Sequence, residues 1–145
     1  MKRIDALLAD YGASHRTPGN LACHAAGITL ILFGLLSILA ALPVGGGWTA
    51  SELLVAAAFV VYAALDVPLA LAVLAYQAIL DVAARGIGDW RVGVAALVIG
   101  WTFQAVGHGV YEKNRPAFFH NLAHLAVGPA YLAAEALGRR RPAAQ

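Results

Sequence analysis

The chain has little charge and little sulfur. Only 12% of its 145 residues are charged and 61% are hydrophobic, whereas a soluble domain carries about 25% charge. This composition excludes an ordinary soluble globule and predicts a membrane protein. The net charge of +2 is too small to indicate a nucleic-acid partner. The single cysteine, Cys23, cannot form an internal disulfide and excludes a cysteine-based zinc finger.

Several sequence patterns of well-known functions are also missing. The chain has no Gly-x-Ser-x-Gly elbow, P-loop or dinucleotide-binding motif. Its N-terminal stretch lacks the continuous apolar core of a signal peptide. No internal repeat or linker divides the sequence, so we expect one membrane domain over residues 1–145.

The apolar runs predict an all-α fold, a polytopic membrane bundle of four to five hydrophobic helices. Residues 1–13 have apolar side chains at helical spacing among charged ones, which is typical of an amphipathic helix on a membrane surface. Leu21–Leu42 is uncharged and long enough to cross a bilayer, and Asn20 is its expected N-cap. The other apolar segments are Leu53–Leu80, Val92–Val110 and Ala117–Leu137, and loops are expected at Val44–Ser51 and Ala83–Arg91.

The segment Leu53–Leu80 allows two interpretations. One continuous helix would be about 42 Å long, more than the ~30 Å apolar core of a bilayer needs. It would also bury Asp66 near mid-bilayer, at roughly 2.5–3.5 kcal/mol, and Pro68 disfavours helix at the residue before it. We therefore expect a hairpin that turns at residues 66–68, with Asp66 at the membrane surface. Only the hairpin puts His24 and His108 on the same face of the membrane.

Gly93, Gly100 and Gly107 recur every seven residues along the predicted span Val92–Val110. Small residues at this spacing form a smooth helix face that another helix can approach closely. The alkyl chain of a bound lipid is expected along this face.

The same predicted helix carries a stripe of polar residues, two of which, His108 and Glu112, can bind a metal. Trp101, Gln104, His108 and Glu112 are spaced so that they share one face. A polar stripe on an otherwise apolar helix is costly unless it binds something. Two of the remaining histidines lie where the chain first enters the membrane, and two repeat the four-residue spacing after Pro116; these are His15, His24, His120 and His124.

Each histidine alone has an ordinary explanation, such as a hydrogen-bonded buried pair or an exposed loop residue. Five histidines at one membrane face predict a metal site instead. Imidazole suits Fe, Zn, Cu and Ni, and two histidines with one carboxylate suit non-haem Fe(II) with positions open for oxygen. The expected ligands are His15, His24, His108, His120 and His124. The expected catalytic residues are His24, His108 and Glu112, with Glu112 a ligand or the partner that orients an imidazole. The expected substrate-binding residues are Asn20, Trp101, Gln104, Tyr111 and Asn121.

Two blocks of the chain resemble a known family. The pattern Y-x-x-x-H-x-x-x-x-N-x-x-x-H-x-x-G-I runs from Tyr11 to Ile28, and W-x-x-Q-x-x-G-H-G-x-x-E-K-x-R-P-A runs from Trp101 to Ala117. Both are similar to the small membrane proteins related to the fungal 2-hydroxy fatty acid dioxygenase. The C-terminal pattern of that family is matched by Asn121, Pro129 and Glu135. The resemblance runs almost the full length of the chain.

The resemblance implies an Fe(2+)-dependent enzyme of fatty-acid α-oxidation. Such an enzyme consumes O2 and shortens a 2-hydroxy fatty acid by one carbon, and membrane lipid is an expected partner. It implies that His15, His24 and His108 carry the activity, whereas His120 and His124 depart from the family pattern and would belong to a local variant of the site.

Basic residues suggest the orientation in the membrane. Lys2, Arg3 and Arg16 precede the first span, while the loop Val44–Ser51 has no Lys or Arg. The positive-inside rule then predicts an integral (inner) membrane protein with its site at the cytoplasmic face. Arg85 and Arg91 argue against this orientation, because the hairpin interpretation sends them outside. The oligomeric state stays open.

A different class of function is also compatible with the sequence. In a small membrane transporter or scaffold, ionisable residues inside the membrane would mark an ion path, and the histidines would pass a metal. The residues of such a path would be Asp66, Gln77, Asp81 and Glu135.

Overall fold

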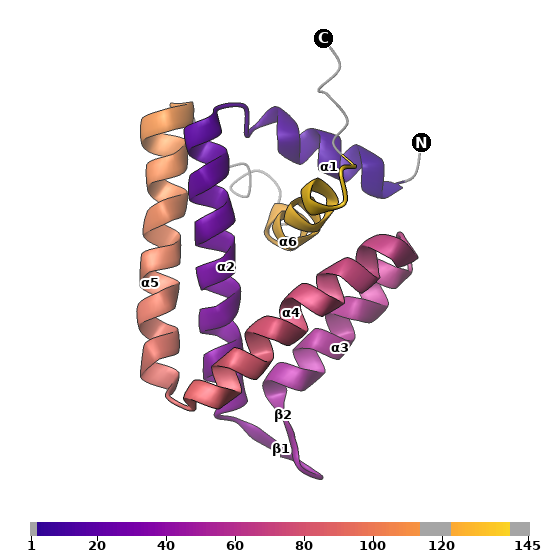
Figure 1. Cartoon of the computed structure of the whole chain (residues 1–145), viewed down its shortest axis with the longest axis vertical. Helices are drawn as coiled ribbons and strands as arrows, with labels where there is room; N and C mark the ends of the chain where they lie inside the picture. The colour runs from indigo at the N-terminus through magenta and orange to yellow at the C-terminus, as the bar shows by residue number, and fades with distance from the viewer. Residues whose placement is uncertain (1–2, 114–122, 140–145) are drawn as a thin grey trace.

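The computed structural model describes residues 3–113 and 123–139. In this part of the chain the elements are six α-helices, one π-helical turn and a two-stranded β-hairpin (Figure 1). The helices are α1 (Arg3–Ala13), α2 (Pro18–Ala40), α3 (Ala50–Ala63), α4 (Val67–Ile87), α5 (Trp90–Val106) and α6 (Ala123–Ala136). The π-helical turn η1 (Gly107–Glu112) continues α5, and the antiparallel strands are β1 (Pro43–Gly45) and β2 (Trp48–Thr49). The all-α fold class is confirmed.

Helix α2 begins earlier than the sequence predicted. Its N-cap is Thr17, whose side chain accepts a hydrogen bond from the backbone N–H of Asn20. The prediction that Asn20 is the N-cap was wrong, because Pro18 lacks an N–H and has the backbone geometry of a first helical position. The capping role therefore falls to the residue before the proline, and Asn20 lies inside the first turn.

Helices α2 and α5 pack against each other along the predicted glycine face. The Cα of Gly100 lies so close to α2 that an added Cβ would be 2.9 Å from the carbonyl oxygen of Gly27. An added Cβ on Gly93 would be 2.8 Å from the carbonyl oxygen of Gly34. The prediction of a close helix approach is confirmed. The expectation that an alkyl chain lies along these glycines was wrong, because the backbone of α2 fills the space.

The hairpin within residues 53–80 is present. Helix α3 ends before the turn, and Asp66 caps α4 by accepting a hydrogen bond from the N–H of Leu69 at 3.0 Å. Its side chain is only 1% exposed and forms a two-point ion pair with Arg139, at 2.8 and 3.2 Å. Asp66 comes directly before the candidate membrane span Val67–Ile87, in agreement with the expected position at the end of a span, but its side chain is covered by protein and not by water. The guanidinium of Arg139 and the backbone N–H of Leu69 stabilise the buried carboxylate of Asp66, in place of water.

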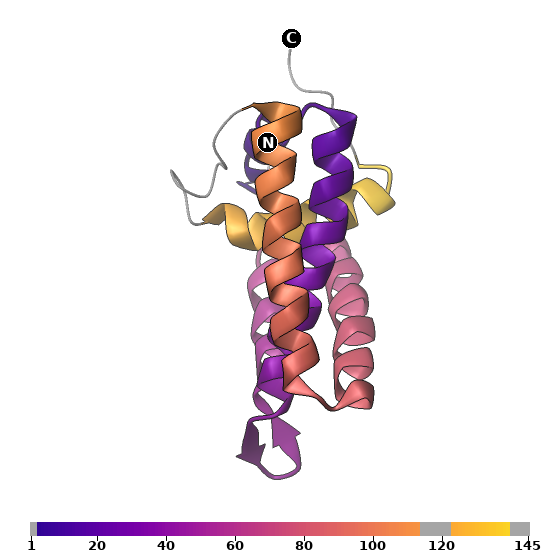
Figure 2. The same ribbon diagram turned by 90° about the vertical axis from the view of Figure 1, so that its left-hand side faces the viewer.

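The turn at Asp66 determines which helix ends meet. The chain runs along α2, returns along α3, runs forward along α4 and returns along α5, so the start of α2 and the end of α5 lie at the same end of the molecule (Figures 1 and 2). His24 and His108 are therefore at one end, as the hairpin interpretation requires.

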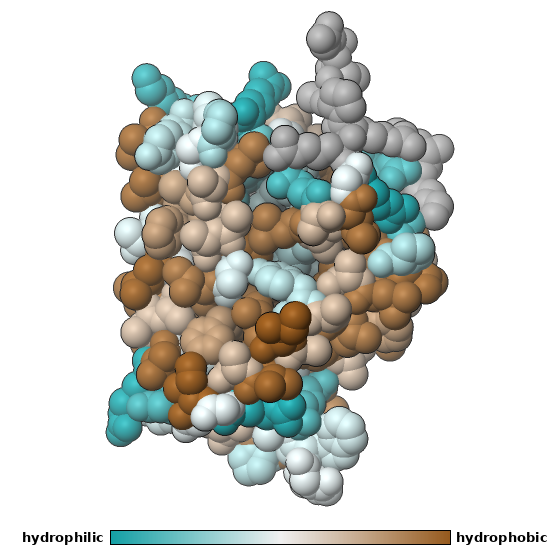
Figure 3. All heavy atoms as spheres, viewed as in Figure 1, coloured by the Kyte–Doolittle hydropathy of each residue, from teal (hydrophilic) through white to brown (hydrophobic). Residues whose placement is uncertain are grey.

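Three segments are long and apolar enough to cross a membrane, namely Pro18–Ala40, Val67–Ile87 and Trp90–Glu112. Helix α3 is apolar but shorter. Hydrophilic side chains gather at the two ends of the molecule, and hydrophobic ones cover the middle of the visible face (Figure 3). This distribution is the one expected of helices surrounded by lipid.

The two predicted loops are more ordered than expected. Residues 43–49 form the β-hairpin, with Gly45, Gly46 and Gly47 at positive φ, and residues 50 and 51 already belong to α3. Helix α4 continues to Ile87 and ends at Gly88, which adopts the left-handed conformation at φ 66°. The prediction that a loop begins at Ala83 was wrong. Asp81 and Arg85 form an i,i+4 ion pair at 2.9 Å, which supports another turn of α4.

The predicted N-terminal helix exists as α1, and its apolar face packs on protein. Ile4 is 3% exposed and belongs to a core cluster with Ala130 and Ala134 of α6 and Leu69 of α4. Helix α1 thus lies across α6 at the histidine end of the molecule (Figure 1).

Candidate metal centre

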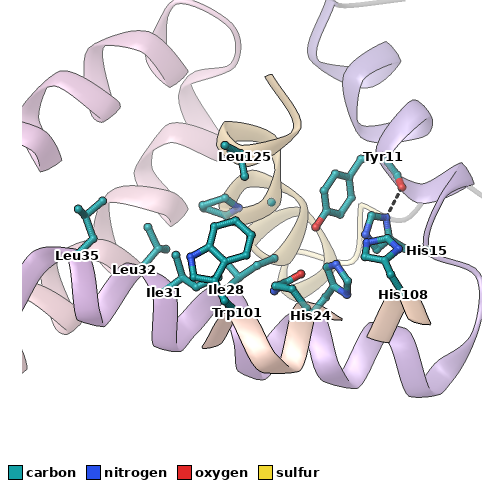
Figure 4. A pocket seen from close by; sticks show the side chains of 13 residues that line it. Tyr11, His15, His24, Ile28, Ile31, Leu32, Leu35, Trp101, His108 and Leu125 are labelled. Atoms are coloured by element: carbon teal, nitrogen blue, oxygen red, sulfur yellow. Dashed lines mark hydrogen bonds between the residues drawn. The ribbon is translucent and has the colours of Figure 1, made fainter. Parts of the chain in front are cut away.

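Three histidines from three segments meet at one end of the bundle. His15 follows α1, His24 lies in the second turn of α2, and His108 lies in η1. All three are buried, with 3–4% of each residue exposed. One ligand nitrogen of each lies within 4.8 Å of the others, and their ring centroids are 4.2–5.0 Å apart. Figure 4 shows the three rings gathered at one end of a cavity.

Backbone carbonyls fix the tautomer of two of these histidines. Nδ1 of His15 donates to the carbonyl oxygen of Tyr11 at 2.6 Å, and Nδ1 of His24 donates to the carbonyl oxygen of Asn20 at 3.0 Å. A carbonyl can only accept, so each Nδ1 carries the proton and the neutral ring keeps its lone pair on Nε2. Metal-binding histidines are typically oriented by such a hydrogen bond from the second nitrogen.

Glu112 is not a member of the three-histidine cluster, but its hydrogen bonds hold the segments that carry the cluster together. Its Oε1 accepts from the backbone N–H of Arg16 at 3.0 Å. Its Oε2 accepts from the N–H and hydroxyl of Thr17 and from the side-chain amide of Asn20, at 2.9–3.1 Å. These four donors surround the carboxylate. Glu112 therefore connects the end of η1 to the chain between His15 and His24, so that all three histidine-bearing segments are held together.

The π-helical turn and a glycine bring His108 close to α2. An added Cβ on Gly107 would meet Oδ1 of Asn20 and would be 3.2 Å from Nδ1 of His24. A larger residue would push the two helices apart at this point. π-Helical turns of this kind are often found at functional sites, and here the turn carries both His108 and Glu112.

A cavity of about 260 Å³ opens from the histidine cluster. Most of its wall is apolar, with side chains from α2, α5 and α6. The lining residues are Tyr11, His15, His24, Ile28, Ile31, Leu32, Leu35, Trp101, Gln104, His108, Leu125, Gly128 and Pro129. A largely apolar cavity with a few polar groups at one end is the usual form of a small-molecule site.

The predicted substrate-binding residues divide into two groups. Trp101 and Gln104 line the cavity, and the buried Nε2 atom of Gln104 has no hydrogen-bond partner among the described residues. Asn20 instead donates its side-chain amide to Glu112, and its backbone carbonyl accepts the hydrogen bond from Nδ1 of His24. The ring of Tyr111 lies against Gly19, outside the cavity lining. His120 and Asn121 lie outside the described residues, as does the side chain of His124.

Sequence reasoning missed Tyr11 as a site residue. Its ring stacks on His15 with centroids 4.0 Å apart and planes 12° apart, and it lines the cavity. Burial, together with the nearby Tyr131 and Glu135, raises the pKa of its hydroxyl, so the group stays protonated and can donate. The signal was available, because Tyr11 and His15 are four residues apart next to a predicted helix.

The donor set fits a divalent transition metal. Neutral imidazoles bind Fe, Zn, Cu and Ni, and ligand atoms at about 2.1 Å from an ion lie roughly 3–4 Å apart. The present spacing, up to 4.8 Å, reaches this range after a small inward movement. No Lys or Arg belongs to the cavity lining, so no described neighbour there opposes a cation.

Comparisons with known proteins identify the family of the chain. No solved structure matches the chain. The chain is 30% identical over 137 residues to the 2-hydroxy-palmitic acid dioxygenase MPO1 of Saccharomyces cerevisiae, covering 90% of this chain and 77% of the yeast protein. The profile of the family described as "2-hydroxy-palmitic acid dioxygenase Mpo1-like" matches residues 1–140. The chain therefore belongs to the Mpo1-like family of 2-hydroxy-palmitic acid dioxygenases, and the predicted family is confirmed.

Proposed function

We propose that this protein is an Fe(II)-dependent dioxygenase in a membrane, which uses O2 to shorten 2-hydroxy fatty acids by one carbon. The observation that carries the proposal is the buried cluster of His15, His24 and His108 at the polar end of an apolar cavity. Family membership supplies the reaction class. The basic residues of the N-terminus support a cytoplasmic position for this end.

The protein groups have separable roles in this proposal. His15 and His24 hold the iron through the Nε2 atoms that their hydrogen bonds to backbone carbonyls leave available, and His108 supplies the third imidazole. Glu112 acts as a positioning residue, because its carboxylate is surrounded by donors from residues 16–20. The iron, when bound, supplies the reaction with O2, and the protein supplies binding, orientation and a dry pocket.

The charge of the site favours an anionic substrate. Three neutral imidazoles leave a divalent ion uncompensated, and Glu112 is bound elsewhere. A 2-hydroxy carboxylate brings the missing negative charge and a second oxygen donor on the adjacent carbon. Gln104 and Tyr11 line the same end of the cavity, and each can donate a hydrogen bond to these oxygens.

The proposed reaction balances with O2 as the oxidant. A 2-hydroxy acid, R–CH(OH)–COOH, and one O2 contain the same atoms as R–COOH, CO2 and H2O. The bond between carbons 1 and 2 breaks, carbon 2 is oxidised to the new carboxyl, and carbon 1 leaves as CO2. No further reductant is needed.

Metal analysis and oxygen uptake test the proposal. The purified protein, stripped with a chelator and reloaded with Fe(II), should consume one O2 for each 2-hydroxypalmitic acid and release an acid one carbon shorter. Palmitic acid, which lacks the 2-hydroxyl, serves as the control and should cause no uptake. Turnover that is indifferent to both the chelator and iron would overturn the iron assignment. A protein that moves metal across liposomes but consumes no oxygen would fit the transporter class instead.

A further inference from the structure

One face of α2 forms a continuous track that leads away from the metal site. His24, Ile28, Ile31 and Leu35 line the cavity at spacings of four, three and four residues, so they share one side of the helix. Figure 4 shows these side chains in a row, with the histidines at one end and Leu35 at the other. At 1.5 Å per residue, the row from His24 to Leu35 is about 16 Å long.

The two ends of this row differ in how they are covered. The histidines are 3–4% exposed, and Ile28 is covered by α6, since an added Cβ on Gly128 would be 3.0 Å from its Cδ1. Farther along, Ile31 and Leu32 are only half-buried, and Leu35 is 36% exposed. The polar end is therefore closed, whereas the apolar end opens on the side of a helix that is long and apolar enough to span a membrane.

We propose that the track of Ile28, Ile31 and Leu35 holds the alkyl chain of the substrate, and that no described residue beyond Leu35 limits the length of that chain. This inference rests on the proposed function for the identity of the head group. It makes Ile31 and Leu35 specificity-determining residues. The alkyl chain would run along α2 from the polar end toward the bilayer centre, as the chain of a fatty acid does in a leaflet.

The length of the track can be converted into the number of alkyl carbons that it holds. An extended alkyl chain advances about 1.3 Å per carbon, from C–C bonds of about 1.5 Å. The distance from His24 to Ile31 then corresponds to about 8 carbons, and the distance to Leu35 to about 13 carbons. Longer chains leave the track and lie among lipid tails, which are as apolar as the protein. The wild-type protein should therefore bind long chains without an upper limit.

Tryptophan substitutions can close the track at chosen points. We expect Ile31→Trp to weaken binding of chains longer than about 8 carbons by about tenfold or more relative to shorter ones, since overfilling a packed space is costly. We expect Leu35→Trp to move the same limit to about 13 carbons. Leu39→Trp, on the same helix outside the cavity lining, is the matched control and should keep the wild-type length profile.

Binding is measured with saturated 2-hydroxy and unsubstituted fatty acids of graded length, by thermal stabilisation of the protein in nanodiscs. Metal content and size-exclusion profiles show that each variant is folded. Wild-type length profiles in both plugged variants would overturn the proposal, and so would a wild-type protein that rejects chains longer than the track. Because this readout needs no turnover, length-dependent binding without oxygen uptake would overturn the proposed function alone.

Discussion

The two ends of the α2–α5 pair are built alike and surrounded differently. At one end Gly93 lies against the backbone of Gly34, and at the other Gly107 lies against the side chains of Asn20 and His24, so a glycine of the α5–η1 segment approaches α2 closely at both. The Gly93 end is surrounded by packing residues such as Leu97 and the Cβ of Ser37. The Gly107 end carries buried imidazoles and a hydrogen-bonded carboxylate.

This difference shows that close helix packing by itself does not make a site. The same seven-residue spacing of small residues produces both contacts. At the Gly107 end a further segment, residues 14–17, brings His15 and the donors that bind Glu112. At the Gly93 end the chain closes through a β-hairpin and through Arg85, which pairs with Glu52 and Asp81. Substitutions at the two ends should therefore differ in their effect on metal binding.

The largest effect is expected for His108→Ala. This change removes one of three ligands from a site whose side chains come from separate segments. Metal binding and oxygen uptake should fall by more than the roughly 10- to 100-fold that loss of a supporting residue costs. Helix content should stay near the wild-type value, because His108 lies near the end of a long helical segment. Circular dichroism and metal analysis check this, and iron at wild-type occupancy would contradict the role of His108.

A matched pair of glycine substitutions separates the two ends. Gly93→Ala and Gly107→Ala each place a Cβ against α2, and each should cost about 1–3 kcal/mol of stability. Only Gly107→Ala should also lower the metal content of the folded fraction, because its Cβ reaches Asn20 and His24. Thermal unfolding in one detergent and metal analysis of the same samples measure both quantities. Equal metal loss in the two variants would contradict the expectation that only the Gly107 end supports the metal site.

Glu112→Gln should have a smaller and specific effect. The amide keeps one acceptor oxygen where the carboxylate has two, and places N–H groups against the donors of residues 16–20. Metal affinity should fall by about 10- to 100-fold while the fold persists. Glu52→Gln, which alters the capping carboxylate of α3 at the other end, is the control and should leave metal affinity unchanged. A titration with a competing chelator gives both values, and equal losses would contradict the positioning role.

The smallest effect is expected for Arg91→Ala at the Gly93 end. The guanidinium lies 5.3 Å from the ring centroid of Trp90, which is 48% exposed. Such an exposed contact contributes about 0.5–1 kcal/mol, so the midpoint of thermal unfolding should fall by less than about 4 °C. Metal content should not change. A measurable loss of metal would show that the two ends are coupled through α5.

Several features could be predicted from residues alone because they depend on local physics. The cost of a charge in lipid and the geometry of Pro68 predicted the turn at Asp66. The spacing of Gly93, Gly100 and Gly107 predicted a close helix contact. The sequence did not predict that Asp66 is buried, because Arg139 lies 73 residues away along the chain. Asn20 has the side chain of a good N-cap, but Pro18 takes the first helical position and the capping role therefore falls to Thr17.

The sequence by itself therefore determined a helical bundle with segments long and apolar enough to cross a membrane, the return of the chain to one end and the presence of imidazoles there. These follow from hydropathy, periodicity and turn chemistry, which act between near neighbours. Only the tertiary structure decided that His15, His24 and His108 form the cluster, that Glu112 binds the chain before α2, and that the cavity follows Ile28, Ile31 and Leu35 instead of the glycines. Each of these depends on which helix faces meet, and that is decided by packing between residues distant in the sequence.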